Sequence, residues 1–238
     1  MAYIAEQPSV IIDQAAYAVS AGSPRSVWRE QDGACLIFTV RPGDVAHYDR
    51  VRKRPYERAE VISIRPFTFG ETNTISFQQY IAPGSAASND RPAVIGQIHN
   101  TGGQTGHPQP FVAMQIIGER QRIITFSGGR TQDVRKSTAQ WVGAVERGRW
   151  VRWVWEFKAD RAETRFQAWR DGIQLFPSAL NLGGYEGPRG PYWQFGIYRS
   201  KDLATMRVAY ADVSLRKASL GSRVANFSAP TCPVQAVK

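Results

Sequence analysis

Short runs of strand-forming residues, separated by turn residues, constrain the fold of this chain more than any other feature. Cys35–Val40 and Ala93–His99 are two such runs, and the ranges 111–117 and 120–126 flank Gly118 as a hairpin would. Asp171-Gly172 is typical of a two-residue hairpin turn. No amphipathic pattern continues for more than about three helical turns. The sequence therefore predicts an all-β protein, an antiparallel β-sandwich or jelly roll.

The length suits one large β domain. The chain has 238 residues, of which 42% are hydrophobic, enough to bury a sizeable core. We expect one domain over residues 1–238, with its core at about 30–217 and irregular N- and C-terminal tails. Residues 130–147 are polar and predict an arm over one edge of the sandwich.

The charge favours a polyanionic partner. Lys and Arg number 30 against 20 Asp and Glu, which gives a net charge of +10, and most of the cations are arginine. Because a guanidinium matches a carboxylate or phosphate with two hydrogen bonds, an acidic polysaccharide, a nucleic acid or an anionic surface would fit. Arginine-rich codon usage would explain the same count. No nucleic-acid-binding signature is present, so we expect neither a nucleic acid nor a membrane as partner.

The two cysteines, Cys35 and Cys232, do not have a metal-binding spacing. They could form one disulfide that ties the C-terminal tail to an early strand, or remain two free thiols. Residues 1–19 lack the pattern of a signal peptide, and no apolar run is long enough to span a membrane. A removed leader, another export route or an intracellular location would each be consistent with this.

The range 192–199 predicts a strand with two different faces. One face is largely apolar, whereas the other carries two phenols and an amide around a glycine: Tyr192, Gln194, Gly196 and Tyr198. Trp193, Phe195, Ile197 and Arg199 belong to the first face. The polar face is typical of the floor of a binding groove, although an ordinary half-buried strand would also show it.

Two further predicted strands carry polar residues on one face, Arg58 with Glu60 and Gln97 with His99. If one concave sheet holds all three strands, these residues line one groove. An arginine, an amide, an imidazole and a phenol together suit β-elimination on a uronic acid. The first two would stabilise the charge that develops on the carboxylate. A base would take the C5 proton, and an acid would protonate the departing O4.

The segments 58–61, 97–99 and 192–199, in this order, resemble the three signature strands of the jelly-roll polysaccharide lyases. The heparin lyase I and glucuronan lyase group is the most similar, and the alginate lyases are more distant. The paired strands in 148–172 also resemble that group, and the likeness covers roughly residues 35–216. It implies a concanavalin A-like β-jelly roll with a concave substrate groove. It also implies a secreted or periplasmic monomer that cleaves glucuronan, or a related glucuronate polymer, by β-elimination.

The resemblance also assigns roles by position. Arg58 and Gln97 bind the carboxylate, His99 is a base or a second neutralising group, and Tyr198 is the catalytic phenol. The expected substrate-binding residues are Glu60, Asn100, Tyr192, Gln194, Arg199 and Arg54. The family pattern has lysine where this chain has Gln194, and Arg199 or the basic loop 52–54 could supply the missing charge. The chemistry requires no cofactor and no catalytic metal; a structural calcium ion is implied only by the resemblance, since no loop has a calcium-binding spacing.

The stereochemistry of the sugar leaves the base open. In glucuronate and mannuronate the C5 hydrogen and O4 leave from the same face, so one phenol could be base and then acid. In iduronate and guluronate they leave from opposite faces, so His99 would be the base and Tyr198 the acid. A tyrosine base needs positive neighbours, because its ordinary pKa is about 10.

Two other functions fit parts of this pattern. A glycan-binding sandwich without catalysis would use the same aromatic and basic residues, but it would not need both His99 and Tyr198. A retaining glycoside hydrolase needs two carboxylates about 5–5.5 Å apart, and no predicted strand offers such a pair.

Overall fold

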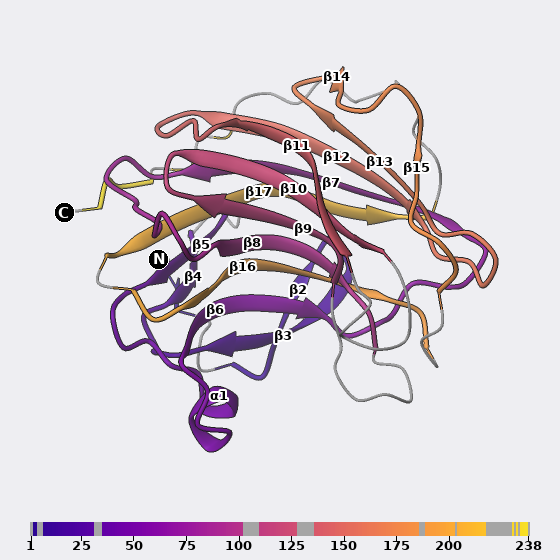
Figure 1. Cartoon of the computed structure of the whole chain (residues 1–238). Helices are drawn as coiled ribbons and strands as arrows, with labels where there is room; N and C mark the ends of the chain where they lie inside the picture. Colours follow the sequence, from indigo (N-terminus) through magenta and orange to yellow (C-terminus); the bar gives the residue numbers. More distant parts are fainter. Residues whose placement is uncertain are drawn as a thin grey trace.

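The computed structural model describes residues 2–3, 7–30, 35–101, 110–127, 136–185, 189–202, 204–217, 230, 232 and 234–237. Two sheets face each other in a sandwich, and the named strands within each sheet pair antiparallel (Figure 1). This confirms the predicted jelly-roll sandwich.

The first sheet has the order β1 (Ala2–Tyr3), β4 (Val27–Arg29), β5 (Cys35–Val40), β17 (Met206–Arg216), β7 (Thr72–Ile81), β12 (Trp150–Lys158), β13 (Arg165–Arg170) and β14 (Ile173–Gln174), with β15 (Leu180–Asn181) also beside β13. The second sheet has the order β11 (Lys136–Ala144), β10 (Arg120–Ser127), β9 (Pro110–Ile117), β8 (Ala93–His99), β16 (Tyr192–Ser200), β6 (Tyr56–Ser63), β3 (Ala15–Ala21) and β2 (Ser9–Ile12). The helix α1 (His47–Val51) lies between β5 and β6 in the chain.

Aromatic side chains from both sheets fill the space between them. Phe77 of β7 packs against Trp155 of β12 and against Trp193 of β16, with ring centroids 5.8 and 5.5 Å apart. Phe195 of β16 contacts Tyr210 of β17 at 4.9 Å. All five are at most 1% exposed. The apolar face predicted for the range 192–199 is therefore a core face, and its opposite face points away from the core.

The prediction that residues 1–30 are irregular is wrong for four segments, which form β1, β2, β3 and β4. β3 is rich in alanine, so its own strand propensity is weak. Its pairing with β6 and the burial of Tyr17 against Phe195 stabilise it instead. A sequence pattern does not contain these distant contacts.

Other expected elements are confirmed. β9 and β10 form the hairpin around Gly118, and Asp171 and Gly172 both adopt the positive φ of the predicted turn. Part of the expected arm at 130–147 is β11, which pairs with β10 at one end of the second sheet. The glycine-rich loop 102–108 and most of the tail after Lys217 lie outside the described residues.

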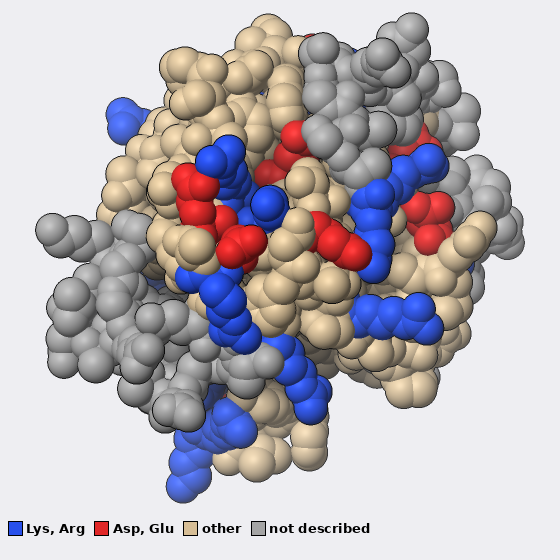
Figure 2. Space-filling model, turned by 90° about the vertical axis from the view of Figure 1, so that its right-hand side faces the viewer, with Lys and Arg blue, Asp and Glu red and all other residues tan. Residues whose placement is uncertain are grey.

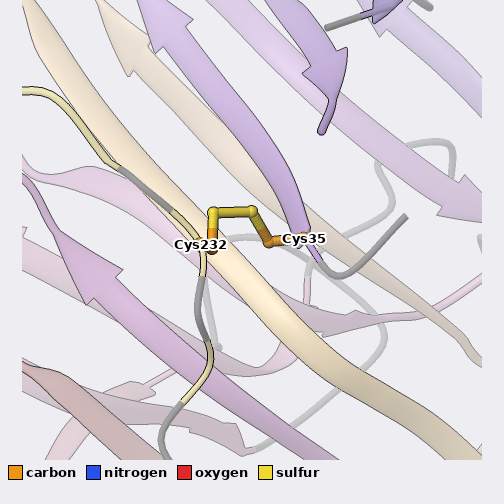
Figure 3. Close-up of a disulfide and its surroundings, with 2 residues drawn as sticks. All are labelled: Cys35 and Cys232. Carbon is orange, nitrogen blue, oxygen red and sulfur yellow. A yellow bond between two sulfur atoms is a disulfide. The ribbon is translucent and has the colours of Figure 1, made fainter. Parts of the chain in front are cut away.

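A disulfide between Cys35 of β5 and Cys232 decides the question that the cysteine count left open (Figure 3). The bridge lies in a second apolar cluster, with Trp28, Ile37 and Ala209, on the face of β5 opposite the main core. The C-terminal segment continues this attachment, because the backbone N–H of Val237 donates to the carbonyl of Pro83. The tail is thus fixed to the outer side of the first sheet.

We expect the double variant Cys35→Ser/Cys232→Ser to lose about 2–5 kcal/mol of unfolding free energy, because the bridge closes a long loop in the unfolded chain. Urea unfolding with and without a reductant measures this. The reductant should lower the midpoint of the wild type and leave that of the double variant unchanged. Equal midpoints for the wild type under both conditions would contradict the expectation.

Candidate active site

Three neighbouring strands of the second sheet bring the predicted residues together. β16 lies between β8 and β6. Tyr198 is opposite Arg58 of β6, Gln194 is opposite Gln97 of β8, and Tyr192 is opposite His99. On β6 and β16 the alternate residues, such as Ala59, Val61 and Ile197, are fully buried in the core. The group therefore lies on the face of the sheet that points away from the core.

Gly196 shapes this face between Gln194 and Tyr198. Its φ is 128°, and a Cβ atom there would lie 2.3 Å from the carbonyl oxygen of Ala59, so only glycine fits without a shift of backbone. The β16–β8 register changes between Phe195 and Tyr198. Such an irregularity re-aims neighbouring side chains. Gly196 thus sets the direction of Tyr198 relative to Gln194.

Arg58 is held by two carboxylates, one of which sequence reasoning missed. Its Nε lies 2.9 Å and its Nη2 3.3 Å from the two oxygens of Asp49, a fully buried residue of α1. Its Nη1 lies 3.3 Å from Glu60. Burial opposes the charge of Arg58, but Glu60 and Asp49 outweigh it, so its pKa is raised. Asp49 is the only acid among residues 47–54, which are otherwise rich in arginine. The local sequence does not reveal which arginine it contacts.

Tyr198 packs between Arg58 and another phenol. The Arg58 guanidinium carbon lies 4.4 Å from the centroid of the Tyr198 ring, and the Tyr56 ring lies at 4.9 Å. Burial raises the pKa of Tyr198, and this exceeds the lowering by Arg58. The positive neighbour expected for a tyrosine base is therefore present, but it does not produce a phenolate.

Glu60 connects the arginine to the amides. Its Oε1 accepts a hydrogen bond from Nε2 of Gln97 at 3.4 Å, and Gln194 also bonds to its carboxylate. Burial raises the pKa of Glu60, against the opposing effects of Arg58 and both amides. The residue is only 1% exposed, and its contacts hold Arg58 and the two amides in place.

His99 has a defined tautomer. Its Nδ1 lies 2.8 Å from the backbone carbonyl of Asn100, and because a carbonyl only accepts, Nδ1 carries the hydrogen. The Tyr192 hydroxyl oxygen lies 3.2 Å from the same nitrogen, and the two rings stack at 5.3 Å. The neutral ring then has its lone pair on Nε2. His99 is the group of this cluster suited to accept a proton at neutral pH.

The expected substrate-binding residues do not all lie together. Arg199 lies on the core side: it is 2% exposed, its Nε donates to Glu57 at 2.9 Å, and its Nη2 donates to the carbonyl of Ala204. The structure therefore places Arg199 away from the polar face, with its charge paired in the interior. Asn100 is also buried, and Arg54 lies beside α1 with its guanidinium 5.8 Å from the Tyr48 ring.

The structural calcium ion stays a prediction of the resemblance, and the described residues provide no acidic cluster that would support it. Within them, no group of three or more His, Cys, Asp or Glu residues is arranged to hold a metal ion. The cluster of Arg58, Gln97, His99 and Tyr198 instead offers a cation, an amide, a base and an acid on one face.

Comparison with known proteins identifies the family. The model of the polysaccharide lyase family, described as "Polysaccharide lyase", matches residues 20–214. The chain belongs to this family of polysaccharide lyases. No curated protein sequence matches it.

Solved structures share the lyase fold. An endo-β-1,4-glucuronan lyase from the fungus Trichoderma reesei is similar with a TM-score of 0.61 and 16% identity, over 90% of this chain and 92% of that one. The alginate lyase PA1167 from Pseudomonas aeruginosa gives a TM-score of 0.60 and 14% identity, over 85% and 98% of the two chains. At these identities the likeness concerns the fold, whereas the family match establishes the lyase.

We expect Asp49→Asn to lower the free energy of unfolding of this lyase by about 3 kcal/mol, because it breaks a buried ion pair with Arg58. It should also lower the pKa of Tyr198, since the charge of Asp49 helps to raise it. Urea unfolding and the pH–rate profile measure the two effects. The exposed pair Asp90–Arg91 supplies the control, because Asp90→Asn should cost less than about 1 kcal/mol. Equal losses in both variants would show that the Asp49–Arg58 contact does not stabilise the site.

Proposed function

We propose that this polysaccharide lyase cleaves a polymer of 4-O-linked uronic acid by β-elimination, with glucuronan or a related glucuronate polymer as substrate. The observation that carries the proposal is the convergence of Arg58, Gln97, His99 and Tyr198 on one face of three adjacent strands. Similarity to a glucuronan lyase supports the choice of polymer.

The chemistry follows from the groups present. Arg58 and Gln97 bind the uronate carboxylate and stabilise the negative charge that develops there when the C5 proton leaves. Nε2 of His99 takes that proton, and the Tyr198 hydroxyl protonates O4 as the C4–O4 bond breaks. The products are a new reducing end and a sugar with a C4–C5 double bond. The two proton transfers balance, and the reaction involves neither an oxidant nor a covalent enzyme intermediate.

Similarity to a glucuronan lyase is what favours glucuronate as the substrate. In glucuronate the C5 hydrogen and O4 leave from one face of the ring, so His99 and Tyr198 would both approach the sugar from that face. In guluronate and iduronate they would approach it from opposite faces.

The disulfide supports a secreted or periplasmic location, because such bridges persist in oxidising compartments. The only named helix of the described residues, α1, is too short to cross a membrane. We propose that the lyase acts as a monomer on an extracellular acidic polysaccharide.

An ultraviolet assay tests the substrate. Glucuronan, mannuronate-rich and guluronate-rich alginates, heparan sulfate and hyaluronan are each incubated with the protein. Absorbance of the conjugated double bond should rise fastest with glucuronan. A rise only with guluronate-rich alginate or another polymer would overturn the proposed substrate while leaving the lyase activity intact. No rise with any uronate polymer would overturn the proposed β-elimination.

A further inference from the structure

The helix α1 and the residues that follow it form a basic arm, residues 47–54. It contains Arg50, Arg52, Lys53 and Arg54, but Asp49 is its only acid, and that carboxylate is engaged with Arg58. Within the described part of the chain, no ion pair engages the four basic side chains. Among the described residues, no carboxylate therefore neutralises the positive charge of the arm.

Several other surface arginines are engaged in ion pairs. Arg147 pairs with Glu119, Arg149 with Asp171 and Glu146, and Arg165 with Glu163. Figure 2 shows this contrast on one side of the molecule: basic and acidic side chains adjoin across its middle, whereas the basic side chains at its lower end lie without acidic neighbours. The helix α1 is at the same lower end in Figure 1. An unpaired basic cluster beside paired ones indicates a place for an external anion.

The Tyr48 ring contacts two arginines of the basic arm, Arg52 and Arg54. The guanidinium carbon of Arg52 lies 4.2 Å from the centroid of the Tyr48 ring, and Nη1 of Arg52 donates to the Tyr48 hydroxyl. The guanidinium of Arg54 approaches the same ring at 5.8 Å. Contact with one ring restricts both guanidinium groups and so reduces the rotamer freedom that they lose when they bind an anion. The Tyr48 side chain is 46% exposed, so a ligand can reach this cluster.

The basic arm is fixed close to the catalytic cluster. Asp49 joins it to Arg58, and the N–H of Arg54 donates to the carbonyl of Asp49 at 2.8 Å. Burial is the main reason that the pKa of Tyr192 is raised to about 12, and Tyr48 adds to this shift. The Tyr48 phenol is thus within electrostatic reach of the central strand β16. The arm borders the face that carries Arg58 and Tyr198.

We propose that Tyr48, Arg52 and Arg54 form a second carboxylate-binding subsite, which holds a uronate adjoining the sugar that is cleaved. The proposal rests on the proposed function, because only an acidic polymer presents a carboxylate on each neighbouring sugar. The planar guanidinium groups match a carboxylate with two hydrogen bonds. The subsite also supplies positive charge at the edge of the catalytic face, where Asp49 contacts Arg58. Removal of this charge weakens binding without changing the reacting groups.

Binding measured apart from turnover tests the subsite. In the Tyr198→Phe background, where we expect the polymer to remain uncut, isothermal titration of a glucuronan oligosaccharide gives the dissociation constant. We expect Arg52→Gln to raise it about tenfold, as for the loss of one charge-assisted hydrogen bond. Arg52→Lys keeps the positive charge but loses the planar guanidinium group, so it should raise the dissociation constant less. In the otherwise unchanged enzyme, Arg52→Gln should raise KM and leave kcat within about twofold.

Arg216→Gln is the matched control, because it removes one exposed arginine from β17 of the other sheet. It should leave the dissociation constant unchanged. If Arg52→Gln has no greater effect than Arg216→Gln on a polymer that the wild type cuts, the subsite is wrong and the proposed function stands. If the wild type neither cuts nor binds any polyuronate, both proposals fail.

Discussion

Replacing Tyr198 by phenylalanine should lower kcat by about 10³-fold, within the range usual for the loss of a general acid. The variant lacks only the hydroxyl that protonates O4. Its ring can still pack against Arg58 and Tyr56, so the fold and the carboxylate-binding groups should be preserved. The initial rate of ultraviolet absorbance on glucuronan measures the loss, and titration with an oligosaccharide should give a dissociation constant close to that of the wild type.

Tyr56→Phe is the matched control for this substitution. It removes a phenolic hydroxyl from the ring that packs 4.9 Å from Tyr198, on the neighbouring strand. We expect its kcat to stay within a few-fold of the wild type. Normal turnover by Tyr198→Phe, or an equal loss in both variants, would show that the hydroxyl of Tyr198 is not the acid.

Replacing His99 by glutamine should lower kcat by about 10²–10⁴-fold, because the base that takes the C5 proton is lost. Glutamine keeps polar atoms near the carbonyl of Asn100 and the hydroxyl of Tyr192, the two partners of Nδ1. Initial rates of ultraviolet absorbance on glucuronan measure the loss.

The exposed His47 at the start of α1 provides the control, since His47→Gln changes the same residue type outside the cluster. Its rate should match that of the wild type. If His99→Gln retains most of the activity while Tyr198→Phe is inactive, Tyr198 is both base and acid. A glucuronate substrate would permit that, but the phenol would then have to ionise despite its raised pKa.

Much of the site could be predicted because its residues lie in strands with clear alternation. Once β6, β8 and β16 are recognised, the period of two assigns Arg58, Gln97 and Tyr198 to polar faces without any tertiary information. The same rule placed Arg199 on the core face, and Glu57 opposite it in β6 makes that burial tolerable. The expectation that Arg199 binds substrate set this periodicity aside, and the structure agrees with the periodicity.

Other parts depended on contacts between distant segments. The strand β3 has a weak local signal and exists through its pairing with β6. Whether Cys35 and Cys232 pair depends on the path of the tail, because 197 residues separate them in sequence. The ion pair between Asp49 and Arg58 depends on the position of the helix α1 relative to the strand β6. The amino-acid sequence alone does not show which of these distant segments come into contact.

The sequence by itself determined the sandwich and the candidate chemistry, because strand periodicity, turn residues and the order of three motifs are local properties. Only the tertiary structure decided the electrostatic state of the groups. Burial raises the pKa of Tyr198 more than the charge of Arg58 lowers it. The carbonyl of Asn100 fixes the tautomer of His99. These balances depend on solvent exclusion and on charges that the fold brings close together, which sequence spacing does not record.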